Sequence, residues 1–216
     1  MNENAEEAAT VTPGSKHAAL SRPEDWDWVD RSIWTERMLA ALGNGVRGGK
    51  WFSLIDKVYR PTTLRSAWQQ VLRNRGAAGV DRVSVERFAG QLDRYLGELE
   101  RELQSGHYRP MPVRRVEIPK PDGKLRPLGI PTVRDRVVQA AVKRVIEPIF
   151  EQLFLPTSFG FRPGRSCKDA LRVVDGLLQA GHTHVVDADL KGYFDSIPHD
   201  RLKQKLAEHL SDSRVL

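Results

Sequence analysis

The chain has 216 residues, of which 40% are hydrophobic and 29% charged, so it suits one or two soluble domains with a packed core. Its single cysteine, Cys167, excludes an intrachain disulfide framework and a cysteine-rich zinc site, and it favours a reducing, cytoplasmic location. We expect no membrane partner, because no apolar run approaches the roughly 20 residues of a membrane span and the N-terminus lacks secretory-signal features.

The net charge of +6 is unevenly distributed along the chain. Residues 1–30 hold two basic and seven acidic side chains, a net of −5. Residues 101–145 hold eleven basic and four acidic side chains, a net of +7. A basic segment of this kind is typical of a surface that binds nucleic acid, and a solvated basic surface is the alternative interpretation.

The first half of the sequence predicts helices. Residues 1–24 are rich in Ala, Glu, Thr and Pro and lack hydrophobic periodicity, which predicts a disordered tail. Apolar side chains then recur at helical spacing in three stretches, so we expect helices over residues 26–42, 51–73 and 84–104. The sequence therefore predicts a mainly helical region over residues 25–107.

A different pattern begins after residue 108 and predicts a β-hairpin. Residues 113–118 alternate apolar and charged side chains, as a half-buried strand does. Residues 119–124 contain a Pro-Asp-Gly turn, and residues 125–130 form the expected partner strand. The hairpin carries a group of basic side chains: Arg114, Arg115, Lys120, Lys124 and Arg126.

The hairpin leads into a predicted helix with a well-defined start. Thr132 is a good N-cap, and Asp135 three residues later resembles the second member of a capping box. Pro148 is expected to end or kink this helix. Its buried stripe is expected to consist of Val133, Val137, Ala141, Val145 and Ile149.

Three further elements are predicted toward the end of the chain. Ser166 with Asp169 predicts the start of a helix that runs to about Gln179. A strand is expected over residues 183–190, followed by a helix over residues 199–210.

The predicted strand over residues 183–190 carries two aspartates near its C-terminal end. Side chains alternate between the two faces of a strand, so Asp187 and Asp189 share one face with Val185, and the apolar opposite face is expected to pack on the core. Paired carboxylates suit Mg²⁺, a hard cation that takes oxygen ligands. The alternative is that an aspartate here only caps the turn that follows.

Longer motifs now carry a family resemblance. The pattern Asp189-x-x-x-Tyr193-Phe194-Asp195 resembles the first carboxylate motif of polymerase palm domains. The surrounding string VVDADLKGYFDSIPHDRL is similar to group II intron reverse transcriptases, also called maturases. Three earlier blocks resemble the family's N-terminal block and its first and second fingers motifs, in the family's order: NRGAAGVD (74–81), residues 108–142 and SFGFRPGRSCKDAL (158–171).

This resemblance covers residues 51–216 and implies an α+β fold. It consists of the fingers and partial palm of a right-hand, reverse transcriptase-like polymerase with a helical N-terminal extension. The implied organisation is a disordered tail (1–24), the helical extension (25–107), the fingers (108–182) and the start of the palm (183–216). The sequence contains no Tyr-Ala-Asp-Asp, the family's second metal motif, so we expect the chain to stop inside the palm and to be inactive alone. An exposed palm edge is then expected to favour self-association.

The implied function is that of a group II intron-encoded RNA-directed DNA polymerase. Such a protein also binds intron RNA and assists splicing and intron mobility, and its partners are intron RNA, an RNA template, a DNA primer and dNTP. Two alternatives stay open. The chain is a non-enzymatic RNA-binding maturase module, or it belongs to a retron or diversity-generating reverse transcriptase. The block at residues 74–81 favours the intron lineage.

The resemblance also implies residue roles in the polymerase site. Asp189 is the expected catalytic residue and ligand of Mg²⁺ in a two-ion site, because two ions stabilise the attacking and leaving oxygens of nucleotide addition. Lys120 and Arg126 are expected to contact the incoming triphosphate. Phe194 is the expected barrier to a 2′-hydroxyl on the sugar, with Tyr193 beside it in the nucleotide site.

Other basic residues are expected to contact the RNA backbone, and a plain surface role is the alternative for each of them: Arg114, Arg115, Lys124, Arg162 and Arg165. Two aromatics in the second fingers motif, Phe159 and Phe161, leave two interpretations open. They stack on template bases, or they pack within the fold.

Overall fold

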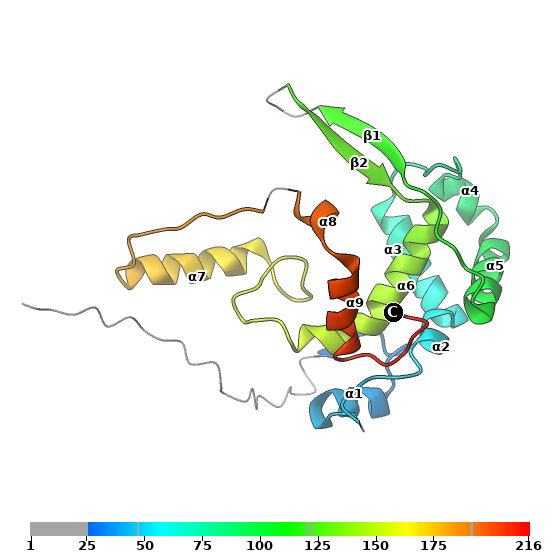
Figure 1. Ribbon diagram of the computed structural model, residues 1–216, viewed down its shortest axis with the longest axis horizontal. Coiled ribbons are helices and arrows are strands. Elements are labelled where there is room, and N and C mark those ends of the chain that lie inside the picture. Colours follow the sequence, from blue (N-terminus) through cyan, green and yellow to red (C-terminus); the bar gives the residue numbers. More distant parts are fainter. Residues whose placement is uncertain (1–25, 47, 120, 122, 191) are drawn as a thin grey trace, which may run out of the picture.

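The computed structural model describes residues 26–46, 48–119, 121, 123–190 and 192–216. The predicted tail over residues 1–24 lies outside the described residues. The described elements, in chain order, are α1 (Glu36–Asn44), α2 (Ile55–Val58), α3 (Pro61–Asn74), α4 (Val85–Ala89), α5 (Leu92–Ser105), β1 (Arg114–Pro119), β2 (Leu125–Ile130), α6 (Val133–Glu151), α7 (Cys167–Gln179), α8 (Tyr193–Ser196) and α9 (His199–Ala207). Figure 1 shows the hairpin projecting from a group of helices around α6.

Helix α6 is the centre of the core. All five residues of its predicted apolar stripe are buried. Helix α3 packs along α6, and α2 and α5 contact both of these helices. Stacked rings join the neighbouring helices: Trp68 lies 4.9 Å from Phe88, and Phe88 lies 4.5 Å from Tyr95, between ring centroids. Pro148 lies inside α6, and the helix continues past it to Glu151, so the proline does not end it.

The predicted N-terminal helices are real but shorter than their apolar stripes. Residues 26–34 form turns that bury apolar side chains, and α1 begins only after Thr35, whose hydroxyl accepts a hydrogen bond from Met38 N at 3.4 Å. The helix predicted over residues 51–73 is divided into α2 and α3, and Pro61 begins α3, because a proline at the first helical position loses no hydrogen bond. The helix predicted over residues 84–104 is likewise divided, into α4 and α5.

The predicted hairpin is confirmed. Strands β1 and β2 pair antiparallel, with Arg114 opposite Ile130 and Ile118 opposite Arg126. The expectation that its strands are half-buried is wrong for most positions, since Ile118, Leu125 and most of both strands are exposed. The physical reason is that no layer of the described chain covers either face of the hairpin.

A single buried carboxylate holds both ends of the hairpin. Asp135, only 2% exposed, accepts hydrogen bonds from the Tyr108 hydroxyl at 2.7 Å and the Met111 backbone N–H at 3.1 Å, both before β1. It also accepts one at 2.7 Å from the hydroxyl of Thr132, which follows β2. The predicted Thr132–Asp135 start of α6 is therefore confirmed, and Asp135 has a larger role than capping.

The loop between α3 and α4 lies against this same point. A Cβ on Gly79 would lie 2.6 Å from Thr132 Cα, so only glycine fits there. The Arg136 guanidinium donates to the carbonyls of Arg75 and Ala77, at 3.1 and 2.8 Å. The block at residues 74–81 thus supports the base of the hairpin.

The elements after α6 agree with prediction only in part. Helix α7 ends at Gln179 and starts with the predicted Ser166–Asp169 capping box, but none of its residues is buried. The strand predicted over residues 183–190 is absent, and Val186 on its expected core face is 93% exposed. A strand exists only through hydrogen bonds to a neighbour, and no described strand lies beside this segment. The last predicted helix ends at Ala207, not at residue 210.

Residues 209–216 form what we call the C-terminal strap. Trp51 N donates to the His209 carbonyl at 2.8 Å, and Ser211 N donates to the Trp51 carbonyl at 2.8 Å, which makes a short parallel β-bridge. The buried Asp212 carboxylate accepts from Leu54 N at 2.6 Å and Ile55 N at 2.9 Å at the start of α2. The strap therefore fastens the end of the described chain to its N-terminal helices.

Hydrogen bonds decide the ionisation of Asp212. Burial disfavours the charged carboxylate, but the backbone N–H groups of Ile55, Leu54, Arg214 and Val215 outweigh it and lower the pKa of Asp212.

Among the described residues, no helix is both long and apolar enough to cross a membrane.

Replacing Asp212 by alanine is expected to destabilise the chain by about 1–3 kcal/mol at pH 7, because buried N–H donors lose their acceptor. The matched substitution of the exposed Asp27 should change stability by less than about 0.5 kcal/mol. The folded-state pKa of Asp212 is lowered, so its contribution is present above the unfolded-state value of about 3.9 and is lost as pH falls through the folded-state value. Denaturant unfolding of the unaltered chain and of Asp212→Ala should show that their difference in free energy of unfolding is smaller at pH 3 than at pH 7. An equal difference at both pH values would contradict this role.

Candidate nucleotide and nucleic-acid site

The hairpin places its basic residues on two faces. Arg126 is directly opposite Ile118, and Ile118 is four residues from Arg114, so Arg114 and Arg126 share a face of the hairpin. At about 3.3 Å per residue, they are separated by about 13 Å along the strands. Lys120, the predicted partner of Arg126 in triphosphate binding, lies outside the described residues. Arg126, a predicted nucleotide contact, and Arg114, a predicted RNA contact, therefore lie on the same face of the hairpin.

The other predicted RNA contacts of the hairpin differ in their surroundings. Arg115 lies on the second face, where its guanidinium is 3.8 Å from the Glu117 carboxylate. Arg114 is half-buried, and its Nε is buried without a hydrogen-bond partner among the described residues. Lys124 is exposed where the turn meets β2. The hairpin thus keeps several cations accessible to a polyanion.

The predicted catalytic segment is open to solvent. Asp187 and Asp189 are both exposed in the unpaired segment 183–190. Their carboxylate oxygens fit the donor preference of Mg²⁺, but no group of three or more His, Cys, Asp or Glu side chains suited to a metal occurs among the described residues. The assignment of Asp189 as a metal ligand stays a prediction.

The two predicted sugar-site aromatics follow a tight turn. Gly192 has a φ of +63°, a left-handed conformation that glycine adopts without strain, and it leads directly into α8. The rings of Tyr193 and Phe194 meet edge to face, with centroids 5.5 Å apart, and Phe194 is 82% exposed. Tyr193 can therefore orient the ring of Phe194, and whether Phe194 meets a sugar stays a prediction.

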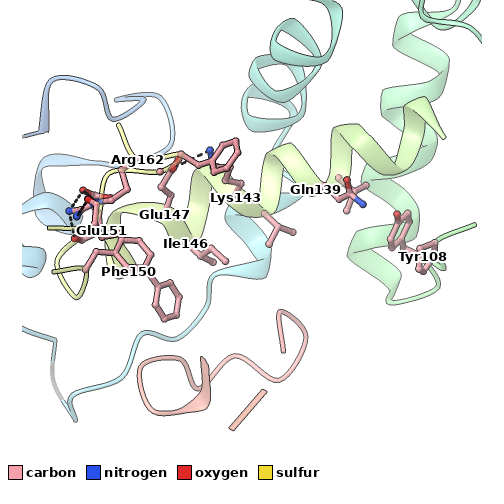
Figure 2. A pocket seen from close by; sticks show the side chains of 15 residues that line it. Tyr108, Gln139, Lys143, Ile146, Glu147, Phe150, Glu151 and Arg162 are labelled. Atoms are coloured by element: carbon pink, nitrogen blue, oxygen red, sulfur yellow. Dashed lines mark hydrogen bonds and ion pairs between the residues drawn. The ribbon is translucent and has the colours of Figure 1, made fainter. Parts of the chain in front are cut away.

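Arg162 is more deeply embedded than its predicted RNA contact requires. Its guanidinium is 2.6 Å from the Glu151 carboxylate, and the two side chains are only 7% and 14% exposed. It also donates to the carbonyls of Leu155 and Ser158 at 2.7 and 2.8 Å. Figure 2 shows this pair at the end of α6, where Arg162 holds the loop that follows the helix. Its RNA contact stays a prediction beside this observed structural role.

The remaining residues of the second fingers motif divide into two kinds. Arg165 donates to the Pro156 carbonyl at 2.5 Å and lies over the Phe159 ring, 5.4 Å from its centroid. Phe159 is half-buried, which agrees with a packing role in this loop. Phe161 is fully exposed, so it does not pack within the described fold.

An apolar hollow of about 740 Å³, which sequence reasoning did not predict, runs along the outer side of α6. Figure 2 shows Gln139, Lys143, Ile146 and Phe150 following one another along this side of the helix, with Tyr108 beyond one end. The only signal in the sequence was that these residues flank the buried stripe of α6, a pattern that equally describes a solvated helix face.

Replacing Arg162 by glutamine is expected to destabilise the chain by about 3–5 kcal/mol, because it leaves the buried Glu151 carboxylate without its partner. Arg172 provides a matched control: its ion pair with Asp169 is largely exposed, so Arg172→Gln should cost less than about 1 kcal/mol. Denaturant unfolding measures the loss of stability in the two variants. Similar losses in both would show that the Arg162–Glu151 pair stabilises the chain no more than an exposed pair does.

Comparison with known proteins follows the same residues. Residues 118–214, from the hairpin to the C-terminal strap, match the model of the family described as reverse transcriptase (RNA-dependent DNA polymerase). Protein YkfC of Escherichia coli (strain K12) is 43% identical over 169 residues, which cover 76% of this chain and 44% of that protein.

Proteins encoded by introns are also similar to the chain. The group II intron-encoded protein LtrA of Lactococcus lactis subsp. cremoris is 38% identical over 143 residues, or 65% of this chain and 23% of that protein. The putative COX1/OXI3 intron 1 protein of Saccharomyces cerevisiae is 35% identical over 129 residues, or 60% of this chain and 15% of that protein. The chain thus spans less than half the length of each of these relatives.

Proposed function

We propose that the chain forms part of an intron-encoded RNA-directed DNA polymerase, because residues 118–214 match the reverse transcriptase family model and the chain is similar to a group II intron-encoded protein. The whole protein binds its intron RNA, copies an RNA template onto a DNA primer with dNTP, and assists splicing and intron mobility. In this proposal, residues 25–107 are the helical extension, residues 108–182 the fingers and residues 183–216 the start of the palm.

The observation that carries the proposal is the continuity of the family match. It includes β2, the whole of α6, Asp189 and the aromatic pair of α8 within one uninterrupted region. Because the match extends over hairpin, helix and carboxylate segment together, it is more specific than any single acidic pair. The intron-encoded relatives favour this function over a retron or diversity-generating reverse transcriptase.

Each element has a physical task in the proposed reaction. Asp189 would hold Mg²⁺, which when bound neutralises charge on the reacting phosphate oxygens. The planar guanidinium of Arg126 offers paired N–H donors to a triphosphate, while Lys120 adds a compact charge. Phe194 presents a bulky ring that excludes a 2′-hydroxyl, and Tyr193 supports that ring from its edge.

The RNA-binding part of the proposal uses cations of the hairpin and of the loop after α6: Arg114, Arg115, Lys124, Arg165 and the more deeply embedded Arg162. RNA binding by these residues does not depend on polymerisation, so a non-enzymatic RNA-binding module is the second candidate function. The basic charge of residues 101–145 supports it as much as it supports the polymerase. We also propose a cytoplasmic location and self-association through the exposed segment 183–190.

The chain is expected to bind a short structured RNA with an affinity that falls as salt rises. Each neutralised phosphate releases condensed counterion, so three to five contacts give a log–log slope of roughly −2 to −4. Arg114→Ala combined with Arg115→Ala should flatten this slope. Lys120→Ala combined with Arg126→Ala is the matched control and should change it less, because those two residues are assigned to the nucleotide. A slope near zero would contradict RNA binding through the basic segment.

We expect no primer extension by the 216-residue chain on an RNA template with dNTP and Mg²⁺. The reason is that its sequence lacks Tyr-Ala-Asp-Asp, the motif that the family resemblance pairs with Asp189. Incorporation of labelled dNTP measures this directly. Incorporation that disappears in Asp189→Asn but persists in Asp187→Asn would show that the chain already holds a working site.

A further inference from the structure

Two adjoining hollows follow α6 on the side where it meets α3. The first, of about 240 Å³, lies between α3 and α6, and the second, of about 320 Å³, continues toward the loop after α6. Gln70 of α3 and Lys143 of α6 line both of them. From Arg136 in the first hollow to Pro148 in the second, α6 rises about 18 Å at 1.5 Å per residue. The two hollows therefore form one elongated track.

The first hollow is basic and rich in amides. Arg75, Arg136 and Lys143 line it, and no aspartate or glutamate does. Its three amide side chains, Gln70, Asn74 and Gln139, make no hydrogen bond to any other residue of the described chain. Amides carry donors and acceptors together, which is the combination that reads the edges of unpaired bases.

The cations of this hollow differ in their availability. The guanidinium of Arg136 already binds the backbone of the α3–α4 loop. Arg75 is exposed, and the exposed ammonium of Lys143 pairs at 3.1 Å with the largely buried Glu147 carboxylate. An ammonium has three N–H donors, so Lys143 can bind a phosphate while it keeps Glu147, and Arg75 is open to a second phosphate.

The second hollow ends at an exposed aromatic. Phe161 lines it together with Trp28, and the Phe161 side chain is fully exposed. Its φ of +58° places a bulky residue in the strained left-handed region. The buried contacts of neighbouring Arg162 hold that backbone in place. A strained residue that presents a ring to solvent is typical of a functional position, and an open ring face suits base stacking.

We propose that this track binds a single-stranded segment of RNA, with a base stacked on Phe161, phosphates at Lys143 and Arg75, and base edges at Gln70, Asn74 and Gln139. The inference rests on the proposed RNA binding and adds a second contact surface, on the helical body, beside the one on the hairpin. Both acidic residues of the second hollow have partners: the Asp30 carboxylate accepts from Ser32 and Ser66 and lies 3.5 Å from Arg144, and the Glu147 carboxylate pairs with Lys143.

The test uses the whole chain and a single-stranded oligouridylate that carries one photoreactive 5-iodouridine. We expect the crosslink, located by mass spectrometry, at Phe161 or Trp28. Phe161→Leu should lower affinity at least about fivefold, because the leucine cannot stack on a base. Phe52→Leu is the matched control, since Phe52 is also an exposed aromatic but lies outside the track, and it should leave affinity unchanged.

Charge is tested separately. Arg75→Gln combined with Lys143→Gln should flatten the log–log salt slope by about 1.4, the value for two lost phosphate contacts on a single strand. Lys205→Gln, which changes an exposed and likewise ion-paired lysine on α9, should leave the slope unchanged. Both positions in the double variant are exposed, and its melting temperature, measured beside that of the unaltered chain, checks that the variant is folded.

The outcomes separate the two proposals. Crosslinks confined to residues 114–126, with binding unaffected by Phe161→Leu and by the double variant, would overturn the track and leave RNA binding by the hairpin in place. No RNA binding by the unaltered chain would overturn the proposed function and the track together. A crosslink at Phe161 with the expected loss of affinity supports both.

Discussion

The arrangement of the molecule depends on one buried carboxylate. Asp135 joins the segment before β1, Thr132 beyond the end of β2 and the first turn of α6, so both legs of the hairpin are fixed to the central helix. Burial first, and then the hydrogen bond to Asp135, raise the pKa of Tyr108. At neutral pH the hydroxyl is consequently protonated and donates its hydrogen bond to Asp135. The direction in which the hairpin projects is thus set inside the core, although the hairpin itself is exposed.

Helix α6 connects this anchor to every surface discussed above. Its buried stripe packs on α3, its N-terminus fixes the hairpin, and its C-terminus fixes the following loop through Glu151 and Arg162. Its remaining sides line the hollows where Lys143 is exposed. One helix therefore positions both the hairpin and the hollows.

Local patterns predicted the features that local forces create. The 3.6-residue period revealed the stripe of α6, alternation and a Pro-Asp-Gly turn revealed the hairpin, and Ser166 with Asp169 revealed the start of α7. The prediction of a strand over residues 183–190 is wrong, because alternating apolar and polar side chains form a strand only where a neighbouring strand supplies hydrogen bonds. Helix breaks at Pro61 and near Gly90 were visible in the sequence, but continuous apolar stripes concealed them.

Long-range geometry was not predictable in the same way. The sequence singled out the second fingers motif, but not that Phe159 is covered while Phe161 is exposed, because that depends on how Arg162 folds the loop. Gln70 and Gln139 resemble ordinary surface residues until α3 and α6 are placed side by side. The family resemblance predicted Asp189 as the catalytic residue, and among the described residues no group of three or more metal-binding side chains occurs that would test this prediction.

The C-terminal strap has a consequence for the order in which the protein acquires its structure during synthesis. Leu54 N and its acceptor Asp212 are separated by 158 positions in the sequence. At 5–20 residues per second, a ribosome needs about 8–30 s to make the intervening chain. Until then the start of α2 has no carboxylate cap and Trp51 has no β-bridge partner. The start of α2 is therefore translated well before the carboxylate that caps it, and a nascent chain passes through a stage in which this turn lacks its acceptor.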